Sequence, residues 1–195
     1  MNEILTDLDR NLFYFCNQGL QNWFFDALFP FLTDLNKKPV ALVLVGILWL
    51  LLLMKSGRHG RIAALLLLPT IVLSDQLNSS FLKFVIERPR PCHELANVHL
   101  LVSCGSGYSF PSSHAVNNFS AAIVLAYFLP KWSWAFLSFA GLVAFSRVYV
   151  GVHYPSDVVA GTVIGLAIGG AVIIVFRHVE EWWARQEHFS RTVQK

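Results

Sequence analysis

Charged residues are scarce in this chain. Lys, Arg, Asp and Glu together make up 14% of its 195 residues, whereas a soluble domain carries about 25%. Hydrophobic residues reach 55%, and the mean hydropathy is +0.52. The formal net charge of +3 gives no reason to expect a nucleic-acid partner. This composition predicts one integral membrane domain spanning residues 1–195.

Cysteine is also rare, and no metal-site pattern accompanies it. The three cysteines, Cys16, Cys92 and Cys104, do not show the repeated paired spacing of a zinc site. Cys92 and Cys104 flank one loop, where a disulfide and two free thiols are equally expected. Cys16 lies in an apolar stretch, where we expect it to be packed.

The chain shows no basic leader, internal repeat or low-complexity tract. Glu3, Asp7 and Asp9 stand where a cleavable secretory signal would carry positive charge. We therefore expect the first membrane segment to act as an uncleaved signal.

Long apolar runs dominate the rest of the chain. Five of them are predicted to cross a bilayer, which requires about 20 residues: 39–54, which is short, and 62–86, 113–129, 132–150 and 155–176. An earlier aromatic stretch, 22–32, contains Asp26 and Pro30 and reads as an interfacial or re-entrant helix. We expect an all-α membrane bundle with about five transmembrane helices. It has an N-terminal interfacial segment (1–36), a transmembrane core (37–177) and a cytoplasmic tail (178–195).

Basic residues predict the orientation of this bundle. Three of them lie in the first short loop, 55–61, and Lys131 lies in the next loop on the same side. The tail after Phe176 adds Arg177, Arg185, Arg191 and Lys195. We predict that this face is cytoplasmic, although Lys37 and Lys38 oppose the rule. The expected location is a bacterial-type cytoplasmic membrane, crossed several times.

Three polar stretches fall on the opposite, extracytoplasmic face. They are 83–91 (KFVIERPRP), 111–114 (PSSH) and 146–157 (SRVYVGVHYPSD). Together they hold cations, two histidines, a carboxylate and a pair of hydroxyls. These are the groups needed to hold a phosphate and break its P–O bond.

The second stretch, PSSH, predicts an anion site. Ser112 is suited to cap a helix that begins at Ser113. The amides of Ser113 and His114 would then lie at a helix N-terminus, where free N–H donors and the helix dipole favour an anion. An ordinary capped helix would show the same triplet.

The third stretch combines a histidine with a carboxylate. Asp157 in the first turn of a helix can reach back to His153 and fix its tautomer. A histidine oriented in this way is typical of a nucleophile or general base. Arg147 offers a planar fork of donors that suits phosphate oxygens. The alternative, a structural Arg–Asp ion pair, leaves His153 without a role.

The first stretch places a cation within an apolar span. Lys83 lies near the end of span 62–86, and an intramembrane charge indicates function. Asp75 and Ser79 share its helix face, and a structural hydrogen-bonding role is favoured for Asp75. Spacing alone does not choose between Arg88 and Arg90, each of which precedes a proline.

The three stretches together resemble the type 2 phosphatidic acid phosphatase superfamily, over about residues 62–176. The similarity lies in Lys83 followed after six residues by Arg90-Pro91, in Pro-Ser-x-His, and in the spacing from Ser146-Arg147 to His153 and Asp157. The resemblance implies a helical membrane phosphatase that forms a phosphohistidine and uses no metal or other cofactor. It assigns His153 as nucleophile, Asp157 as its orienting group and His114 as the acid. It assigns the phosphoryl oxygens to Lys83, Arg90, Ser112, the Ser113 amide and Arg147.

Two departures from the family pattern stand out. Ser113 replaces the usual glycine, and about five spans are expected where members commonly have six.

The resemblance implies a lipid phosphate substrate in the bilayer: undecaprenyl pyrophosphate, phosphatidylglycerol phosphate, phosphatidic acid or the lipid A 1-phosphate. The sequence does not choose among these lipids or fix an oligomeric state. The alternatives are a vanadate-dependent haloperoxidase-like enzyme and a lipid-phosphate carrier without turnover, which gives the pair His153–Asp157 no role.

Overall fold

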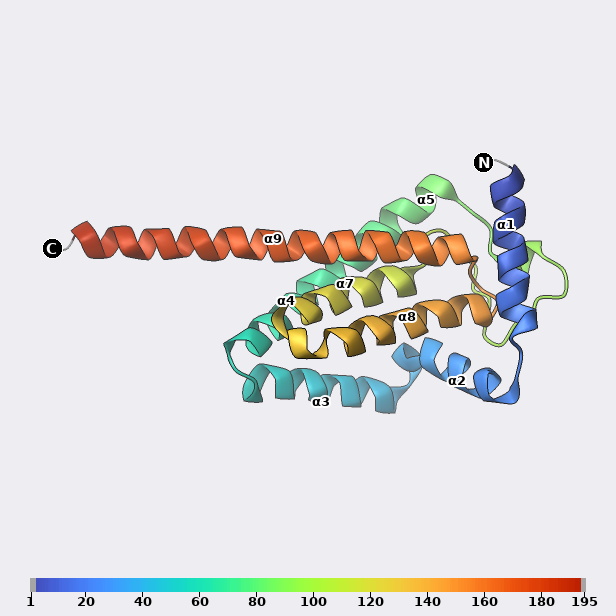
Figure 1. Ribbon diagram of the computed structural model, residues 1–195, viewed down its shortest axis with the longest axis horizontal. Helices are drawn as coiled ribbons and strands as arrows, with labels where there is room; N and C mark the ends of the chain where they lie inside the picture. The colour runs from blue at the N-terminus through green and yellow to red at the C-terminus, as the bar shows by residue number, and fades with distance from the viewer. Residues whose placement is uncertain (1–2, 194–195) are drawn as a thin grey trace.

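The computed structural model describes residues 3–193, and the side chains of residues 3–186. All regular structure within this range is helical, which confirms the all-α prediction. The helices are α1 (Glu3–Tyr14), α2 (Trp23–Thr33), α3 (Pro39–Lys55), α4 (Arg58–Leu77), α5 (Lys83–Ile86), α6 (Pro91–Glu94), α7 (Ser113–Phe128), α8 (Ser133–Tyr149) and α9 (Pro155–Val193). A π-helical turn, Asn78–Leu82, links α4 to α5. In Figure 1, α3, α4, α7, α8 and α9 run along one direction, and α1 crosses one end of the bundle.

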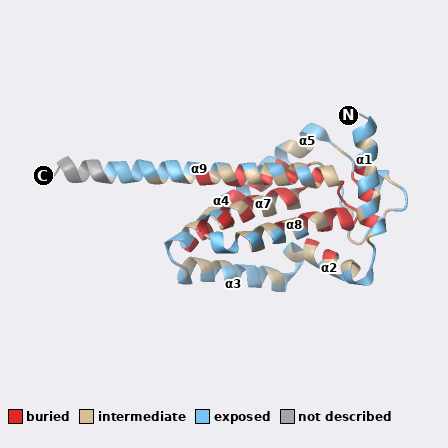
Figure 2. Cartoon of the chain, viewed as in Figure 1, coloured by how far each residue is buried: buried red, intermediate tan, exposed pale blue. Residues whose placement is uncertain are grey.

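Helix α7 is the centre of the bundle, because it packs against α4, α8 and α9. Val124 and Phe128 of α7 form one apolar cluster with Ala63 of α4 and Ile173 of α9. Figure 2 shows that the buried residues concentrate along α7, along α8 and in the first half of α9. Where α9 extends beyond the bundle, its described side chains, up to residue 186, are mostly exposed.

Three glycines allow α9 to approach α7 closely. A Cβ atom at Gly161 would lie 2.8 Å from the Ser112 carbonyl oxygen, and one at Gly165 would lie 2.5 Å from that of Val116. At Gly169 the distance to the Ser120 carbonyl oxygen would be 2.6 Å. Small residues at four-residue spacing are typical of close helix pairs in membranes. This seam fixes the start of α9 against the start of α7, where two of the polar stretches lie.

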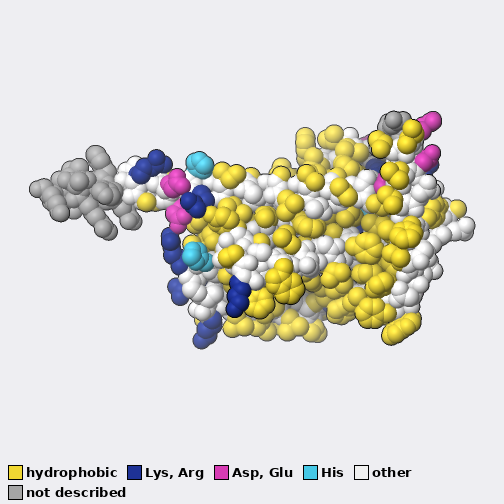
Figure 3. Space-filling model, in the orientation of Figure 1, with side chains coloured by type: hydrophobic (Ala, Val, Ile, Leu, Met, Phe, Trp, Pro, Cys, Tyr) yellow, Lys and Arg dark blue, Asp and Glu magenta, His cyan; other side chains and the backbone are white. Residues whose placement is uncertain are grey.

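The outer surface of the bundle is apolar. Helix α3 buries none of its residues, and its leucines and valines face outward. Hydrophobic side chains cover most of the face in Figure 3. Within the described chain, the stretches Arg58–Glu94 and Pro155–Gln186 are long and apolar enough to cross a membrane. Such a surface is that of a membrane protein; the number of spans stays a prediction.

Basic residues gather at the end of the bundle where α9 leaves it, as Figure 3 shows. Arg58 and Arg177 line a shared groove there, and Arg58 lines a second one with Lys131. The loop, the turn and the tail that carry the predicted cytoplasmic charges therefore come together at one end. The polar stretches lie at the other end. Which side of a membrane each end faces stays a prediction.

The N-terminal segment covers the end that carries the polar stretches. Phe13 of α1 is fully buried against Val148 and Tyr154. Phe29 of α2 packs on Tyr149, with ring centroids 4.8 Å apart. Cys16 packs against the Phe13 cluster, as expected. One side of this segment thus packs on the bundle, while Trp23, Phe24 and Phe31 on its other side are exposed. Its interfacial position in a membrane stays a prediction.

The glycine seam predicts the effect of a single methyl group. Gly165→Ala should lower the free energy of unfolding by about 1–3 kcal/mol, because the new Cβ overpacks against α7 backbone. Gly170→Ala is the matched control on the same helix, since nothing lies within 4 Å of its Cβ position. It should be neutral or stabilise by up to about 1 kcal/mol. Thermal unfolding in detergent measures both variants. Equal melting temperatures for Gly165→Ala and Gly170→Ala would contradict the close contact between α7 and α9.

Candidate functional site

His153 lies in the turn between α8 and α9 and is only 2% exposed. Gly151 allows this turn, because its φ of +88° is strained for other residues. A Cβ at Gly151 would also lie 2.7 Å from Cγ1 of Val98. The Val152 and His153 amides both donate to the Arg147 carbonyl, at 3.2 Å. These constraints hold the imidazole inside the protein, at the end of the bundle.

Three cations from two of the polar stretches surround His153. Burial lowers the pKa of His153 well below its usual value, and the charges of Arg147, Arg90 and Lys83 lower it further. Contact with the Ser109 backbone opposes this effect. Both effects favour the neutral form of the His153 imidazole. This is the form that a nucleophile or general base requires.

Neutral oxygens, rather than carboxylates, hold these cations. Lys83 Nζ donates to the Tyr108 carbonyl at 3.0 Å, and Arg90 Nε donates to the Gly107 carbonyl at 2.7 Å. Arg147 Nη1 donates to the Thr33 hydroxyl. Within the part of the chain that the structure describes, no carboxylate is hydrogen-bonded to these three cations.

Asp157 lies beside His153, as predicted, but mainly binds other groups. Its Oδ2 is 3.4 Å from His153 Nδ1, and the geometry is not that of a hydrogen bond. The same oxygen accepts the Tyr154 amide at 2.8 Å, and Oδ1 accepts Arg88 Nη1 at 2.8 Å. The carboxylate is thus fixed by Tyr154 and Arg88, and the imidazole rests against it.

Ser112 takes the N-cap position of α7, as predicted, but its side chain makes no capping hydrogen bond. The first hydrogen bond of the helix runs from the Val116 amide to the Ser112 carbonyl. The earlier amides, those of Ser113 and His114, therefore have no partner inside the helix. The Ser113 hydroxyl accepts from Asn78 Nδ2 at 2.8 Å. Among the described residues, the Ser112 hydroxyl also has no hydrogen-bond partner. The anion site at this helix start stays a prediction.

Several buried polar atoms at this end have no hydrogen-bond partner among the described residues. They include Ser112 Oγ, Arg147 Nε and His153 Nδ1. Buried polar atoms in native proteins are almost always paired. Unpaired atoms that come from two polar stretches and lie at the same end of the bundle indicate a site built for a polar ligand.

His114 lies at the border between this site and a groove. Its Nε2 is 3.1 Å from the Thr33 carbonyl, which leaves its other ring nitrogen available. The groove has a volume of about 440 Å³ and is walled by apolar side chains of α3 and α8. Thr33 contacts both His114 and Arg147, and no sequence motif pointed to it.

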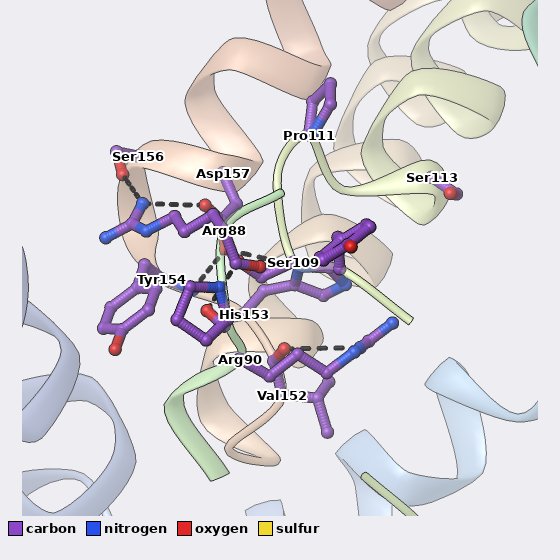
Figure 4. A network of polar contacts seen from close by, with 12 residues as sticks. Arg88, Arg90, Ser109, Pro111, Ser113, Val152, His153, Tyr154, Ser156 and Asp157 are labelled. Atoms are coloured by element: carbon purple, nitrogen blue, oxygen red, sulfur yellow. Dashed lines mark hydrogen bonds and ion pairs between the residues drawn. The ribbon is translucent and has the colours of Figure 1, made fainter. Parts of the chain in front are cut away.

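Arg88 and Asp9 were also not identified as site residues from the sequence. Arg88 donates to Asp157 at 2.8 Å and to Asp9 Oδ2 at 2.7 Å, and its guanidinium stacks 3.8 Å from the Tyr154 ring centroid. Asp9 is only 7% exposed, and its Oδ1 accepts the Ser156 amide. In Figure 4, Arg88 reaches Asp157 and Ser156, while Arg90 bonds the Val152 carbonyl. The two arginines therefore have different partners: Arg90 lies with the cations, and Arg88 holds the carboxylate.

Cys92 and Cys104 form a disulfide, one of the two alternatives that the sequence left open. The bridge closes the loop before Gly107 and Tyr108, whose carbonyls hold Arg90 and Lys83. His93 Nε2 lies 3.3 Å from Cys104 Sγ, so these three residues also form a cluster of potential metal ligands. A metal binds thiolates, and the disulfide removes them.

This fold and site define a helical protein with an apolar outer surface and with three cations next to a buried histidine. Residues 63–180 match the family model of the PAP2 superfamily, and the chain belongs to this family. The resemblance seen in the three sequence signatures is thereby confirmed.

Two curated relatives and one solved structure illustrate the similarity. The chain is 32% identical to the lipid A 4'-phosphatase of Bacteroides thetaiotaomicron, over 91% of this chain and 80% of that protein. It is 30% identical to the undecaprenyl-diphosphatase BcrC of Bacillus subtilis, over 74% of this chain and 71% of that protein. The crystal structure of Aquifex aeolicus LpxE superposes with a TM-score of 0.70 at 28% identity, covering 85% of this chain and 94% of that one.

The cations around His153 predict its titration. His153 should remain neutral at pH 6.5, near the usual pKa of histidine, because burial and positive charge disfavour the imidazolium. Lys83→Met should raise the pKa of His153, since it removes one of these charges. NMR of ring-labelled histidine in micelles measures both, with Lys131→Met as a distant control. A His153 pKa of 6.5 or higher would contradict the statement that burial and the neighbouring cations lower it.

The two ion pairs of Arg88, with Asp9 and with Asp157, predict that Asp9 helps to position Asp157. Asp9→Asn should lower kcat about tenfold, equal to about 1.4 kcal/mol, because Arg88 then holds Asp157 less firmly. KM should change little, since Lys83, Arg90 and Arg147 are untouched. Steady-state kinetics on a lipid phosphate separates the two constants. Arg10→Gln is the control on the same helix, because its ion pair with Glu94 is partly exposed. An equal loss in both variants would indicate a general role of α1 in folding.

Proposed function

We propose that the protein removes phosphate from a membrane lipid, without a metal, through a phosphohistidine intermediate. The chain is an enzyme of the lipid phosphatase and diphosphatase class. The observation that carries the mechanism is the buried imidazole of His153, which lies with the unpaired Ser112 Oγ and Arg147 Nε among three cations. Among the described residues, no carboxylate is hydrogen-bonded to these cations.

In the first step, His153 Nε2 attacks phosphorus and a P–N bond forms. The bond between phosphorus and the lipid oxygen breaks, and the electron pair stays on that oxygen. His114 gives this oxygen a proton, so the lipid leaves as a neutral alcohol, or as a lipid phosphate when the substrate is a pyrophosphate. Asp157 lies on the Nδ1 side of His153 and stabilises its positive charge.

In the second step, water attacks phosphorus and the P–N bond breaks. His114 takes the proton from water, and His153 returns to its neutral form. Inorganic phosphate leaves, so the two steps together consume one water. Lys83, Arg90 and Arg147 stabilise the charge that spreads over the phosphoryl oxygens, and the amides at the start of α7 assist them.

The groove beside His114 supports a lipid as the leaving group. It begins at the predicted acid and continues between α3, α7 and α8, along apolar side chains. The relative that acts on lipid A 4'-phosphate aligns over nearly all of this chain. We therefore take a lipid A-type sugar phosphate as the first candidate substrate and undecaprenyl pyrophosphate as the second.

The proposed location is the cytoplasmic membrane, crossed by several helices, with the site on the extracytoplasmic face. The gathering of Arg58, Lys131 and Arg177 at the opposite end supports this orientation. A carrier that binds lipid phosphate would use the same cations, but it would not need a neutral, buried His153.

Phosphate release from purified protein tests this proposal. Release from at least one lipid should persist in EDTA and should vanish in His153→Ala, because the nucleophile is lost. Asp157→Asn should slow release about tenfold or more, equal to at least about 1.4 kcal/mol. His178→Ala, at the far end of the bundle, is the matched histidine control. Release that survives in His153→Ala, or that EDTA abolishes, would contradict the mechanism.

A further inference from the structure

The groove beside His114 contains an unexpected polar row. Its walls are apolar and come from α3 and α8, but Asp75, Asn117 and Asn118 line it as well. A groove for hydrocarbon alone needs no carboxylate or amides, since an ionisable group that faces hydrocarbon is costly and indicates a function. The row therefore requires an explanation beyond the binding of an acyl or polyprenyl chain.

Hydrogen bonds hold the row in place. Asn117 Nδ2 donates to Asp75 Oδ1 at 3.1 Å, and Ser79 Oγ donates to the same oxygen at 3.3 Å. Ser74 Oγ donates to Asn117 Oδ1 at 2.9 Å, which fixes the orientation of the amide. The other oxygen, Asp75 Oδ2, accepts no hydrogen bond from the part of the chain that the structure describes. A fixed carboxylate with one free oxygen on a groove wall is an acceptor for a ligand donor.

The row lies next to the proposed leaving group. Asn117 and Asn118 follow His114 by three and four residues on α7, so they lie on the same helix face, about one turn or 5.4 Å deeper. Asn118 Nδ2 donates to the His114 carbonyl at 2.8 Å. The group released when the P–O bond breaks at His114 would therefore lie within about one helical turn of the Asp75–Asn117 row.

The charge of the leaving group then decides how well it fits. A phosphomonoester on a sugar releases a neutral alcohol whose neighbouring hydroxyls can donate to Asp75 and Asn117. A lipid pyrophosphate releases a lipid phosphate, and this second phosphate would lie close to the Asp75 carboxylate. Two negative charges at short range repel strongly where water is scarce.

We propose that Asp75, fixed by Asn117, selects phosphomonoesters with a hydroxyl-rich leaving group and disfavours lipid pyrophosphates. The proposal rests on the phosphatase function proposed above and assigns its substrate class. Asp75 acts on specificity and takes no part in the transfer of the phosphoryl group.

The ratio of two specificity constants tests the proposal. The substrates are a 4'-phosphorylated lipid A and undecaprenyl pyrophosphate, presented in the same detergent. In Asp75→Asn, kcat/KM for the pyrophosphate relative to the monoester should rise at least about tenfold, equal to about 1.4 kcal/mol. Asn has the same shape as Asp without the charge. Asp75→Ser is a second neutral variant, to be used if Asp75→Asn does not fold.

Glu180→Gln is the matched control, because it removes a carboxylate at the far end of the bundle, where Glu180 pairs with Arg58. A rise in the ratio in the neutral Asp75 variants and not in this control would support the proposal. A ratio within twofold of wild type in both Asp75 variants would overturn it, provided that turnover still depends on His153. A wild-type enzyme that prefers the pyrophosphate tenfold or more would overturn it as well. Absence of His153-dependent release from every lipid would instead refute the phosphatase function, and this inference with it.

Discussion

The crowding of positive charge around a buried histidine is the constraint on which the rest of this structure depends. Lys83, Arg90 and Arg147 repel one another, and their repulsion is strong where water is excluded. Carbonyls of the loop at 107–108 and the hydroxyl of Thr33 hold them without neutralising them. In the proposed mechanism, a bound phosphate group would relieve this repulsion, and a transferring phosphoryl group with more charge on its oxygens would relieve it further.

The N-terminal segment is part of the site, although the family match covers only residues 63–180. Thr33 of α2 contacts both His114 and Arg147, and Asp9 of α1 shares Arg88 with Asp157. Asp9 supplies a buried negative charge on the outer side of Arg88, so Arg88 is balanced between two carboxylates. Such support keeps reactive groups in place while they remain unpaired.

Helix α7 has two different sides. On one side the α9 glycines bring two backbones into close contact, which leaves no space and fixes the PSSH turn against the first turn of α9. On the other side α3 buries none of its residues, and a groove remains between α3, α7 and α8. The rigid side positions the chemical groups, and the open side leaves room for a lipid.

The sequence alone determined the helical class, the family and the three signatures. Hydropathy and the spacing of nearby residues are properties of the sequence and can be read without knowing the fold. The same spacings predict Lys83, His114, His153 and Asp157 as site residues, and the structure places them at one end of the bundle. Only the tertiary structure decided the rest. In the sequence, Asp9 only argued against a basic leader, and no motif pointed to Thr33. Each of them contacts the site through packing between segments that lie far apart in the chain. The same holds for the different partners of Arg88 and Arg90, which look alike in sequence and differ only in the direction of their side chains.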